Sequence, residues 1–194
     1  MKVLTVIFLL STSVLALENL VDVSYSKYQG TALPDGITQW LGVRYAAPPL
    51  GDLRFAPPQD PDRNETTQVA DQVSKKGRLT GEDGLKIQYS TGKLCLATVD
   101  VPNVTTTFED CLFLDVFAPS GATKQSKLPV FFIQGGGFNA NSNPNLNGSG
   151  LIIASGRKIV VVEINYRVGS YGFIAGSEIE SANNGLRDQR KALE

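Results

Sequence analysis

Apolar residues gather in short runs in the second half of this chain, and three of these runs have the length and composition of strands. They span residues 112–117, 130–134 and 159–166. The last two are nearly continuous apolar runs, a pattern typical of strands covered on both faces in a mostly parallel sheet. Between them, residues 149–155 can form a short helix that ends at Gly156. Strands and helices alternate, so the predicted fold class is α/β.

The first half of the chain alternates strand-like runs with irregular segments. Residues 21–25 and 40–45 are rich in β-branched and aromatic residues, and a Pro-Asp-Gly turn signal at residues 34–36 lies between them, so we expect small antiparallel strands. The prolines within residues 48–61 exclude a regular helix or a central strand there. Residues 62–107 are polar with scattered glycines, which predicts a long surface excursion.

The end of the printed sequence predicts one more helix. Asn183 and Asn184 are suitable N-caps for a helix over residues 186–194. No helix-stopping residue follows, so we expect the chain to end inside this helix.

The N-terminus has the pattern of a secretory signal. Lys2 supplies a basic region, residues 3–10 an apolar core, and Val14-Leu15-Ala16 a cleavage site of small residues. The apolar core is shorter than the roughly 20 residues that a membrane-spanning helix needs. We therefore expect a signal peptide over residues 1–16, one domain over residues 17–194, and a secreted, extracellular protein without a membrane span.

Export changes the interpretation of the cysteines and of the Asn-x-Ser/Thr triplets. The chain has two cysteines, Cys95 and Cys111, and an exported pair predicts a disulfide. A disulfide that closes the loop between Cys95 and Cys111 is expected to stabilise the fold by about 3 kcal/mol in the chain-entropy description. The predicted glycosylation sites are Asn64, Asn103 and Asn147.

The composition of the chain excludes several kinds of partner, catalytic site and metal site. The formal net charge of −1 offers no electrostatic footprint for nucleic acid or for an anionic membrane surface. The 194 residues contain no histidine, so a Ser-His-Asp mechanism cannot lie entirely within them, and with two cysteines they cannot build a usual structural zinc site. We expect no metal and no cofactor.

Residues 109–119 read Glu-Asp-Cys-Leu-Phe-Leu-Asp-Val-Phe-Ala-Pro. This segment closely resembles a signature of type-B carboxylesterases, the family that includes cholinesterases and fungal lipases. An acidic pair leads into a strand that begins with a cysteine and ends at a proline, where ladder hydrogen bonding stops. An unrelated apolar strand would explain the β pattern but not the flanking residues.

A second motif supports the same family. Residues 131–138 read Phe-Phe-Ile-Gln-Gly-Gly-Gly-Phe, a strand that leads into three glycines, and it resembles the family's oxyanion loop. Successive glycines let backbone amides converge on one point without a Cβ in the way. The resemblance implies that Gly136 and Gly137 are the donors. Members of the family often carry histidine or tyrosine in place of Gln134, a difference that leaves the backbone donors intact.

Three further segments match the family in the right order. Residues 41–55 resemble its N-terminal hallmark, residues 165–173 its central strand and loop, and residues 184–193 the helix before the nucleophile. The Ile-Ala-Gly at 174–176 is closest to fungal extracellular lipases. The resemblance implies the N-terminal portion of an α/β-hydrolase fold and a small-molecule or lipid ester as substrate.

The resemblance also implies two ion pairs. They are Arg54 with Glu109 and Arg167 with Asp188. Each would connect distant segments of the chain to the sheet. Surface pairs contribute little to stability, so these pairs matter to the fold only where they are at least partly buried.

The family's Gly-x-Ser-x-Gly elbow, its catalytic acid and its histidine are absent from the 194 residues. Ser149 does not form an elbow, because Asn147 stands where the elbow needs glycine. We therefore expect the N-terminal part of a carboxylic ester hydrolase that stops before its nucleophile. The alternatives are a non-catalytic relative that serves adhesion or recognition, and an incomplete gene product without a role of its own.

We predict that residues 17–194 alone have no serine-esterase activity, because oxyanion donors act only after an activated nucleophile has attacked. The test expresses them in an oxidising compartment and assays short-chain aryl esters beside a Ser149→Ala variant. Turnover that disappears in the variant, or labelling of any serine by an organophosphonate, would contradict the prediction.

Overall fold

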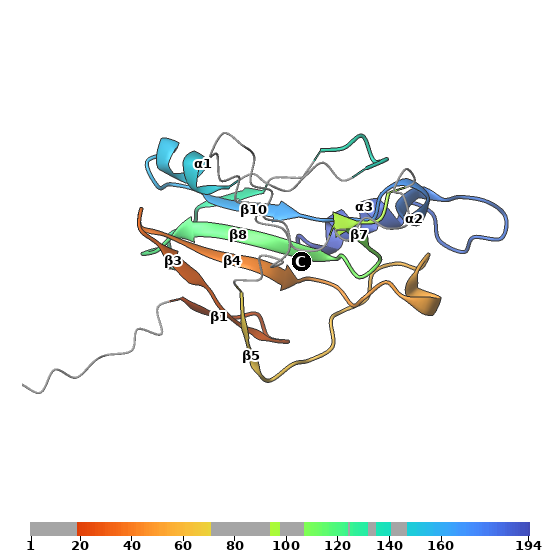
Figure 1. The fold of residues 1–194 in the computed structure, drawn as a ribbon, viewed down its shortest axis with the longest axis horizontal. Coiled ribbons are helices and arrows are strands. Elements are labelled where there is room, and N and C mark those ends of the chain that lie inside the picture. The colour runs from red at the N-terminus through yellow and green to blue at the C-terminus, as the bar shows by residue number, and fades with distance from the viewer. Residues whose placement is uncertain (1–18, 71–93, 98–106, 124, 132–134, 141–146) are drawn as a thin grey trace, which may run out of the picture.

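The computed structural model describes residues 19–70, 94–97, 107–123, 125–131, 135–140 and 147–194. Its centre is a five-stranded sheet with helices at one end and along one side (Figure 1). In spatial order the strands are β3 (Thr31–Leu33), β4 (Ile37–Arg44), β8 (Phe113–Pro119), β10 (Val160–Ile164) and β9 (Pro129–Phe131).

The strand directions differ from the expected mostly parallel sheet. The β3–β4, β4–β8 and β8–β10 pairs are antiparallel, and among the described strands of this sheet only β9 and β10 run parallel. The expectation rested on continuous apolar runs. Such runs report burial on both faces of a strand. They do not report its direction, which depends on the path of the connecting segments.

The N-terminal strands extend beyond the predicted runs. β3 and β4 form a hairpin through the expected turn, where the amide of Gly36 donates to the Leu33 carbonyl at 3.2 Å. The first run contributes β1 (Leu20–Asp22), which pairs antiparallel with β2 (Lys27–Gln29). β2 also pairs parallel with β5 (Thr67–Val69), completing a small second sheet. The strands β2 and β3 were not predicted, because each is only three residues long.

The two predicted helices form close to their expected positions. Helix α1 (Ser149–Ala154) lies against the central sheet, and α3 (Asn184–Lys191) ends at Lys191, so the given sequence does not end inside it as expected. A short helix that was not predicted, α2 (Gly169–Phe173), follows β10 and packs against α3. A 3-10 turn, η1, covers Gly51–Leu53. The strands β6 (Leu94–Cys95) and β7 (Thr107–Phe108) form a separate two-stranded pair.

The predicted capping of α3 is wrong in detail. Asn183 precedes the helix with a left-handed φ of 59°, and its side chain makes no capping hydrogen bond. Asn184 is already the first helical residue. Its side-chain Nδ2 donates to the backbone carbonyls of Phe55 (2.7 Å) and Ser181 (2.9 Å). The two asparagines thus serve a backbone turn and a long-range contact.

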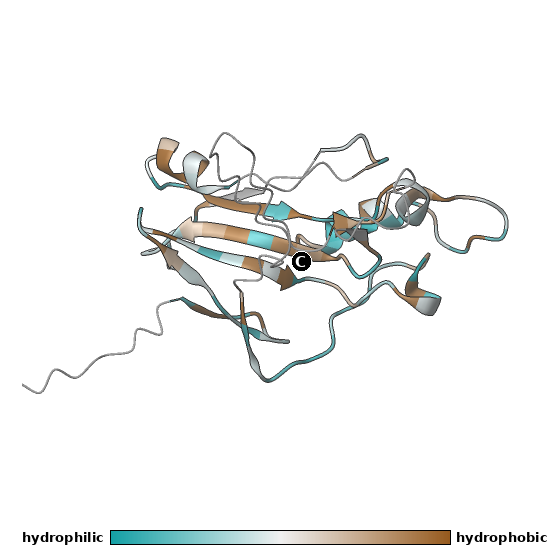
Figure 2. Ribbon diagram, viewed as in Figure 1, coloured by the Kyte–Doolittle hydropathy of each residue, from teal (hydrophilic) through white to brown (hydrophobic). Residues whose placement is uncertain are grey.

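The main core lies between the sheet and α1. It contains five fully buried apolar side chains: Ile37, Leu41, Phe117, Ile152 and Val161. In Figure 2, β8 and β10 are mostly brown with one teal band each, because a single acidic residue interrupts each of these apolar strands.

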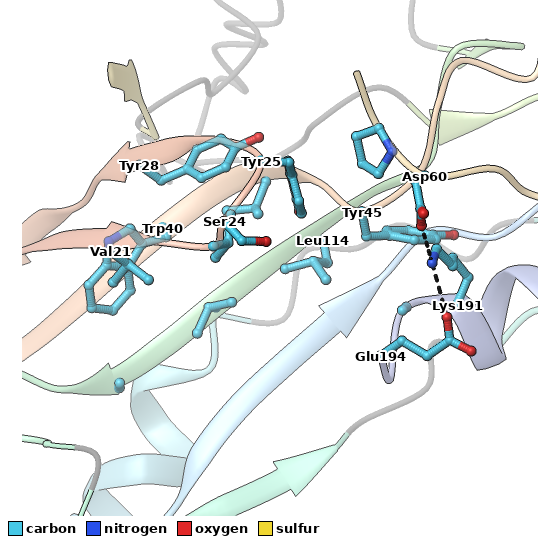
Figure 3. Close-up of a pocket in the computed structure, with 16 residues that line it drawn as sticks. Val21, Ser24, Tyr25, Tyr28, Trp40, Tyr45, Asp60, Leu114, Lys191 and Glu194 are labelled. Carbon is cyan, nitrogen blue, oxygen red and sulfur yellow. Dashed lines mark hydrogen bonds and ion pairs between the residues drawn. The ribbon is translucent and has the colours of Figure 1, made fainter. Parts of the chain in front are cut away.

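The opposite face of β8 borders a large apolar groove of about 810 Å³. Leu114 and Val116 of the central sheet and Tyr25 and Trp40 of the N-terminal segments line it (Figure 3). At one end, Lys191 binds Asp60 at 2.5 Å, and it also binds Glu194. The groove lies between residues of the small sheet and of the central one, and Tyr28 of β2 packs with Val43 of β4 beside it.

Candidate functional site

The glycine loop after β9 contains the two residues that the sequence assigned as oxyanion donors, Gly136 and Gly137. Gly136 and Gly137 have φ angles of 141° and 61°, a region that favours glycine, and both are exposed. The carbonyl of Gly136 accepts hydrogen bonds from the amides of Asn139 and Ala140, both at 3.3 Å. Within the described part of the chain, the amides of Gly136 and Gly137 donate no hydrogen bond. They can therefore donate to a ligand. Gln134 lies outside the described residues.

Phe138 attaches this loop to the rest of the fold. Its carbonyl accepts a hydrogen bond from the amide of Gly169 at 2.6 Å. Its ring meets those of Phe173 and Tyr166 in tilted arrangements, with centroids 5.1 and 6.3 Å apart. Phe138 has a φ of 65°, which is strained for an aromatic residue. Sequence reasoning assigned Phe138 no role, although an aromatic residue directly after three glycines was a visible signal.

A pocket of about 300 Å³ opens beside the loop. Phe138 and Phe173 provide its aromatic surface. The remaining lining residues are Asn139, Gly169, Ser170 and Ile174. Phe138, the residue directly after the three glycines, thus forms part of the wall of a pocket lined by both apolar and polar residues.

Arg167 follows β10 and forms the buried ion pair that the resemblance implied. Its Nε and Nη2 atoms bind the two carboxylate oxygens of Asp188 at 2.8 and 2.7 Å, and its backbone amide binds Asp188 at 3.0 Å. The side chains of Arg167 and Asp188 are 3% and 0% exposed. A bidentate pair in this setting satisfies charges that would otherwise be costly to bury.

The remaining guanidinium nitrogen of Arg167, Nη1, binds the η1 region. Nη1 donates to the carbonyls of Leu53 (3.2 Å), Arg54 (3.0 Å) and Ala56 (2.8 Å). Gly172 of α2 and Gly185 of α3 allow these two helices to approach the Arg167 backbone. A Cβ at either position would lie within 2.4 Å of the Arg167 carbonyl oxygen.

The other predicted ion pair is more exposed. Arg54 Nε binds Glu109 Oε2 at 2.8 Å, with side chains 43% and 20% exposed. Cys95 and Cys111 are joined by a disulfide and lie in a buried cluster with Tyr45 and Leu112. Together these contacts connect β6 and the η1 region to the start of β8.

A third arginine pair was missed. Arg44 binds Asp110 through two hydrogen bonds, of 2.8 and 3.1 Å, and its guanidinium lies 4.3 Å from the centroid of the Phe113 ring. The Glu-Asp dipeptide of the signature therefore binds two different arginines. The separation of 66 residues between Arg44 and Asp110 hides such a pair from local sequence patterns.

Two of the three predicted glycosylation asparagines are described, and both are exposed. The Oδ1 of Asn64 accepts hydrogen bonds from the amide (3.0 Å) and hydroxyl (2.7 Å) of Thr66. The Oδ1 of Asn147 accepts from the amide of Ser149 at 3.0 Å, while the Ser149 hydroxyl is buried. Asn103 lies outside the described residues.

The described residues include neither a membrane-spanning helix nor a metal-binding group of side chains. None of the helices there combines the length and apolarity needed to cross a bilayer. The same residues contain no group of three or more His, Cys, Asp or Glu side chains placed to hold a metal ion.

The sequence profile of the carboxylesterase family matches residues 18–194. This chain belongs to the carboxylesterase family. Secreted lipase 1 of Botryotinia fuckeliana is 39% identical to it over 81% of this chain and 29% of the lipase. Liver carboxylesterase of Sus scrofa is 33% identical over 87% of this chain and 29% of that enzyme.

Solved structures of carboxylesterases confirm the fold. Aspergillus niger EstA superposes with a TM-score of 0.76 at 44% identity, covering 90% of this chain and 31% of EstA. A thermophilic pNB esterase gives a TM-score of 0.69 at 30% identity. The chain thus has the N-terminal portion of an α/β-hydrolase fold and spans about a third of the length of these relatives.

In this carboxylesterase-family chain we predict that Arg167→Met lowers the free energy of unfolding by about 3–5 kcal/mol, because it leaves the buried Asp188 carboxylate without its cation. Arg54→Met is the matched control, since the same replacement removes a half-exposed pair and costs far less. Urea unfolding measures both. Equal midpoints for Arg167→Met and the parent chain would contradict the prediction.

Proposed function

We propose that this chain supplies the oxyanion-binding part of a carboxylic ester hydrolase. The observation that carries the proposal is the glycine loop: Gly136 and Gly137 present exposed amides that, within the described residues, bond to nothing else. When a nucleophile attacks an ester, the carbonyl oxygen becomes an oxyanion. Amide donors held in place for that oxygen lower the barrier.

The pocket beside the loop, which has aromatic and polar parts, supports an ester as the substrate. Phe138 and Phe173 can bind the hydrocarbon part of the substrate while its carbonyl oxygen faces the glycine amides. The relatives named above include a lipase and a carboxylesterase.

The nucleophile and its base remain to be assigned. The 194 residues contain no histidine, and no serine in them has the elbow motif. In our proposal the attacking serine and its histidine lie in parts of the protein outside these residues, and this chain stabilises the charge that their reaction generates.

A chimaera tests this role. Residues 18–194 would replace the matching portion of Aspergillus niger EstA, and kcat and KM would be measured with p-nitrophenyl butyrate. We predict that Gly137→Ala lowers kcat by about 10²-fold, because a Cβ at φ 61° distorts the loop and withdraws a donor.

Gly150→Ala is the matched control. Gly150 lies in α1 with open space around the added Cβ, and its φ is ordinary, so the kinetic constants should stay within about twofold of the parent. An active chimaera in which both variants behave alike would refute the oxyanion role of Gly137. An inactive chimaera that still binds the ester would favour a recognition protein.

We also propose that the protein is secreted, with residues 1–16 as the signal peptide, and that Asn64 carries an N-linked glycan. The segment around Asn64 is exposed, and Asn64 already contacts the Thr66 hydroxyl that completes its triplet. Asn103 and Asn147 are the other proposed sites.

We predict that Asn64→Gln removes one glycan from protein secreted by a eukaryotic host, measured by mass spectrometry before and after enzymatic deglycosylation. Thr66→Val should do the same, because it destroys the triplet. Thr67→Val is the matched control and should leave the glycan in place. An unchanged glycan mass in Asn64→Gln would rule this site out.

A further inference from the structure

Two acidic side chains lie opposite each other inside the central sheet. Asp115 of β8 and Glu163 of β10 are direct partners in the antiparallel register, so both side chains point to the same face. They are only 7% and 3% exposed. Asp and Glu are almost never buried this deeply unless they are paired.

Neither acid has a cation beside it in the described structure. One oxygen of Asp115 accepts a hydrogen bond from the amide of Gly42 at 2.7 Å, at the bulge in β4. Both carboxyl oxygens of Glu163 are buried without a hydrogen-bond partner. Their neighbours along the same face, Val161 and Phe117, belong to the apolar core.

The elements packed around this pair supply no compensating charge. Within the described residues, α1 and β9 contain no ionisable side chain. On β4 the one charged residue is Arg44, which binds Asp110. After α1, Arg157 and Lys158 are exposed, and Arg157 donates to the carbonyl of Asp35.

Electrostatics prevents both acids from ionising easily in this setting. A carboxylate without a partner in an apolar interior is strongly disfavoured, and a second negative charge on the facing strand adds repulsion. Burial, together with the charge of Asp115, raises the pKa of Glu163 to about 8. Burial also raises the pKa of Asp115 to about 6, against the opposing effect of the Gly42 amide.

We propose that Glu163 keeps its proton opposite Asp115 in the β8–β10 pair up to neutral pH, which makes the fold of this chain sensitive to alkali. With Glu163 protonated, the pair buries at most the one negative charge of Asp115, whose carboxylate accepts the hydrogen bond from the Gly42 amide at the β4 bulge. When the second proton leaves, two unpaired charges face each other between the two central strands.

The direction of the pH effect follows from proton linkage. Both groups have higher pKa values in the folded chain than their ordinary values of 3.8 and 4.5. The folded state therefore binds protons that the unfolded state has released, and stability is greatest in acid and falls as the pH rises to about 8. Between about pH 6 and 8, one extra proton in the folded state lowers the folding equilibrium constant about tenfold per pH unit.

Urea unfolding of the purified chain across this pH range tests the proposal. The parent chain should lose at least tenfold in its folding equilibrium constant from pH 6 to 8. Glu163→Gln should remove most of this loss, because an amide cannot ionise. Glu178→Gln is the matched control: Glu178 is exposed, and this variant should keep the parent's pH dependence. The same pH dependence in Glu163→Gln as in the parent would overturn the proposal.

Infrared spectroscopy gives a second readout that does not depend on unfolding. At pH 7 the folded parent should show the carbonyl stretch of a protonated carboxylic acid in a non-exchanging environment, and the band should disappear on titration to pH 9. It should be lost in Glu163→Gln and kept in Glu178→Gln. A folded parent without this band at pH 7 would overturn the proposal, even if Glu163→Gln fails to fold.

Discussion

The packing of this chain depends most on the buried guanidinium of Arg167. It neutralises Asp188 on α3 and donates to the carbonyls of Leu53, Arg54 and Ala56 in the η1 region. Three segments far apart in the sequence meet at one side chain, whose donors would be costly to leave unsatisfied away from water. The planar guanidinium suits this task because its donors point in fixed directions.

The glycine loop depends on the same junction. Arg167 is two residues before Gly169, whose amide binds the carbonyl of Phe138. The path of the chain after β10 is set by the buried ion pair, and the glycine loop is attached to that path through Phe138. The position of Gly136 and Gly137 is therefore linked to contacts that follow β10 and to α3.

The fold contains two solutions to the problem of a buried acid. Asp188 lies against a guanidinium, and its charge is balanced by a cation. Asp115 and Glu163 have no cation among the described residues, and in our proposal a proton takes its place. The two arrangements respond differently to pH, because a guanidinium keeps its charge at every pH of interest whereas the proton on Glu163 is lost in alkali.

The amino-acid sequence determined the features that depend on local patterns. The glycine triplet, the turn at Gly36, the apolar runs and the α1 and α3 helices can be read from it, because each reflects the dihedral preference or the burial of a few neighbouring residues. The Cys95–Cys111 pairing was predictable because the chain has no other cysteine. Family motifs led to the Arg167–Asp188 pair.

Only the tertiary structure decided the strand directions, the Arg44–Asp110 pair and the meeting of Asp115 with Glu163. These depend on which segments lie side by side and in which register. Gly42 and Asp115, which share a hydrogen bond, are 73 residues apart. An acid within an apolar strand is visible in the sequence. Its partner is not, because a shift of one residue in register would turn either side chain to the opposite face of the sheet.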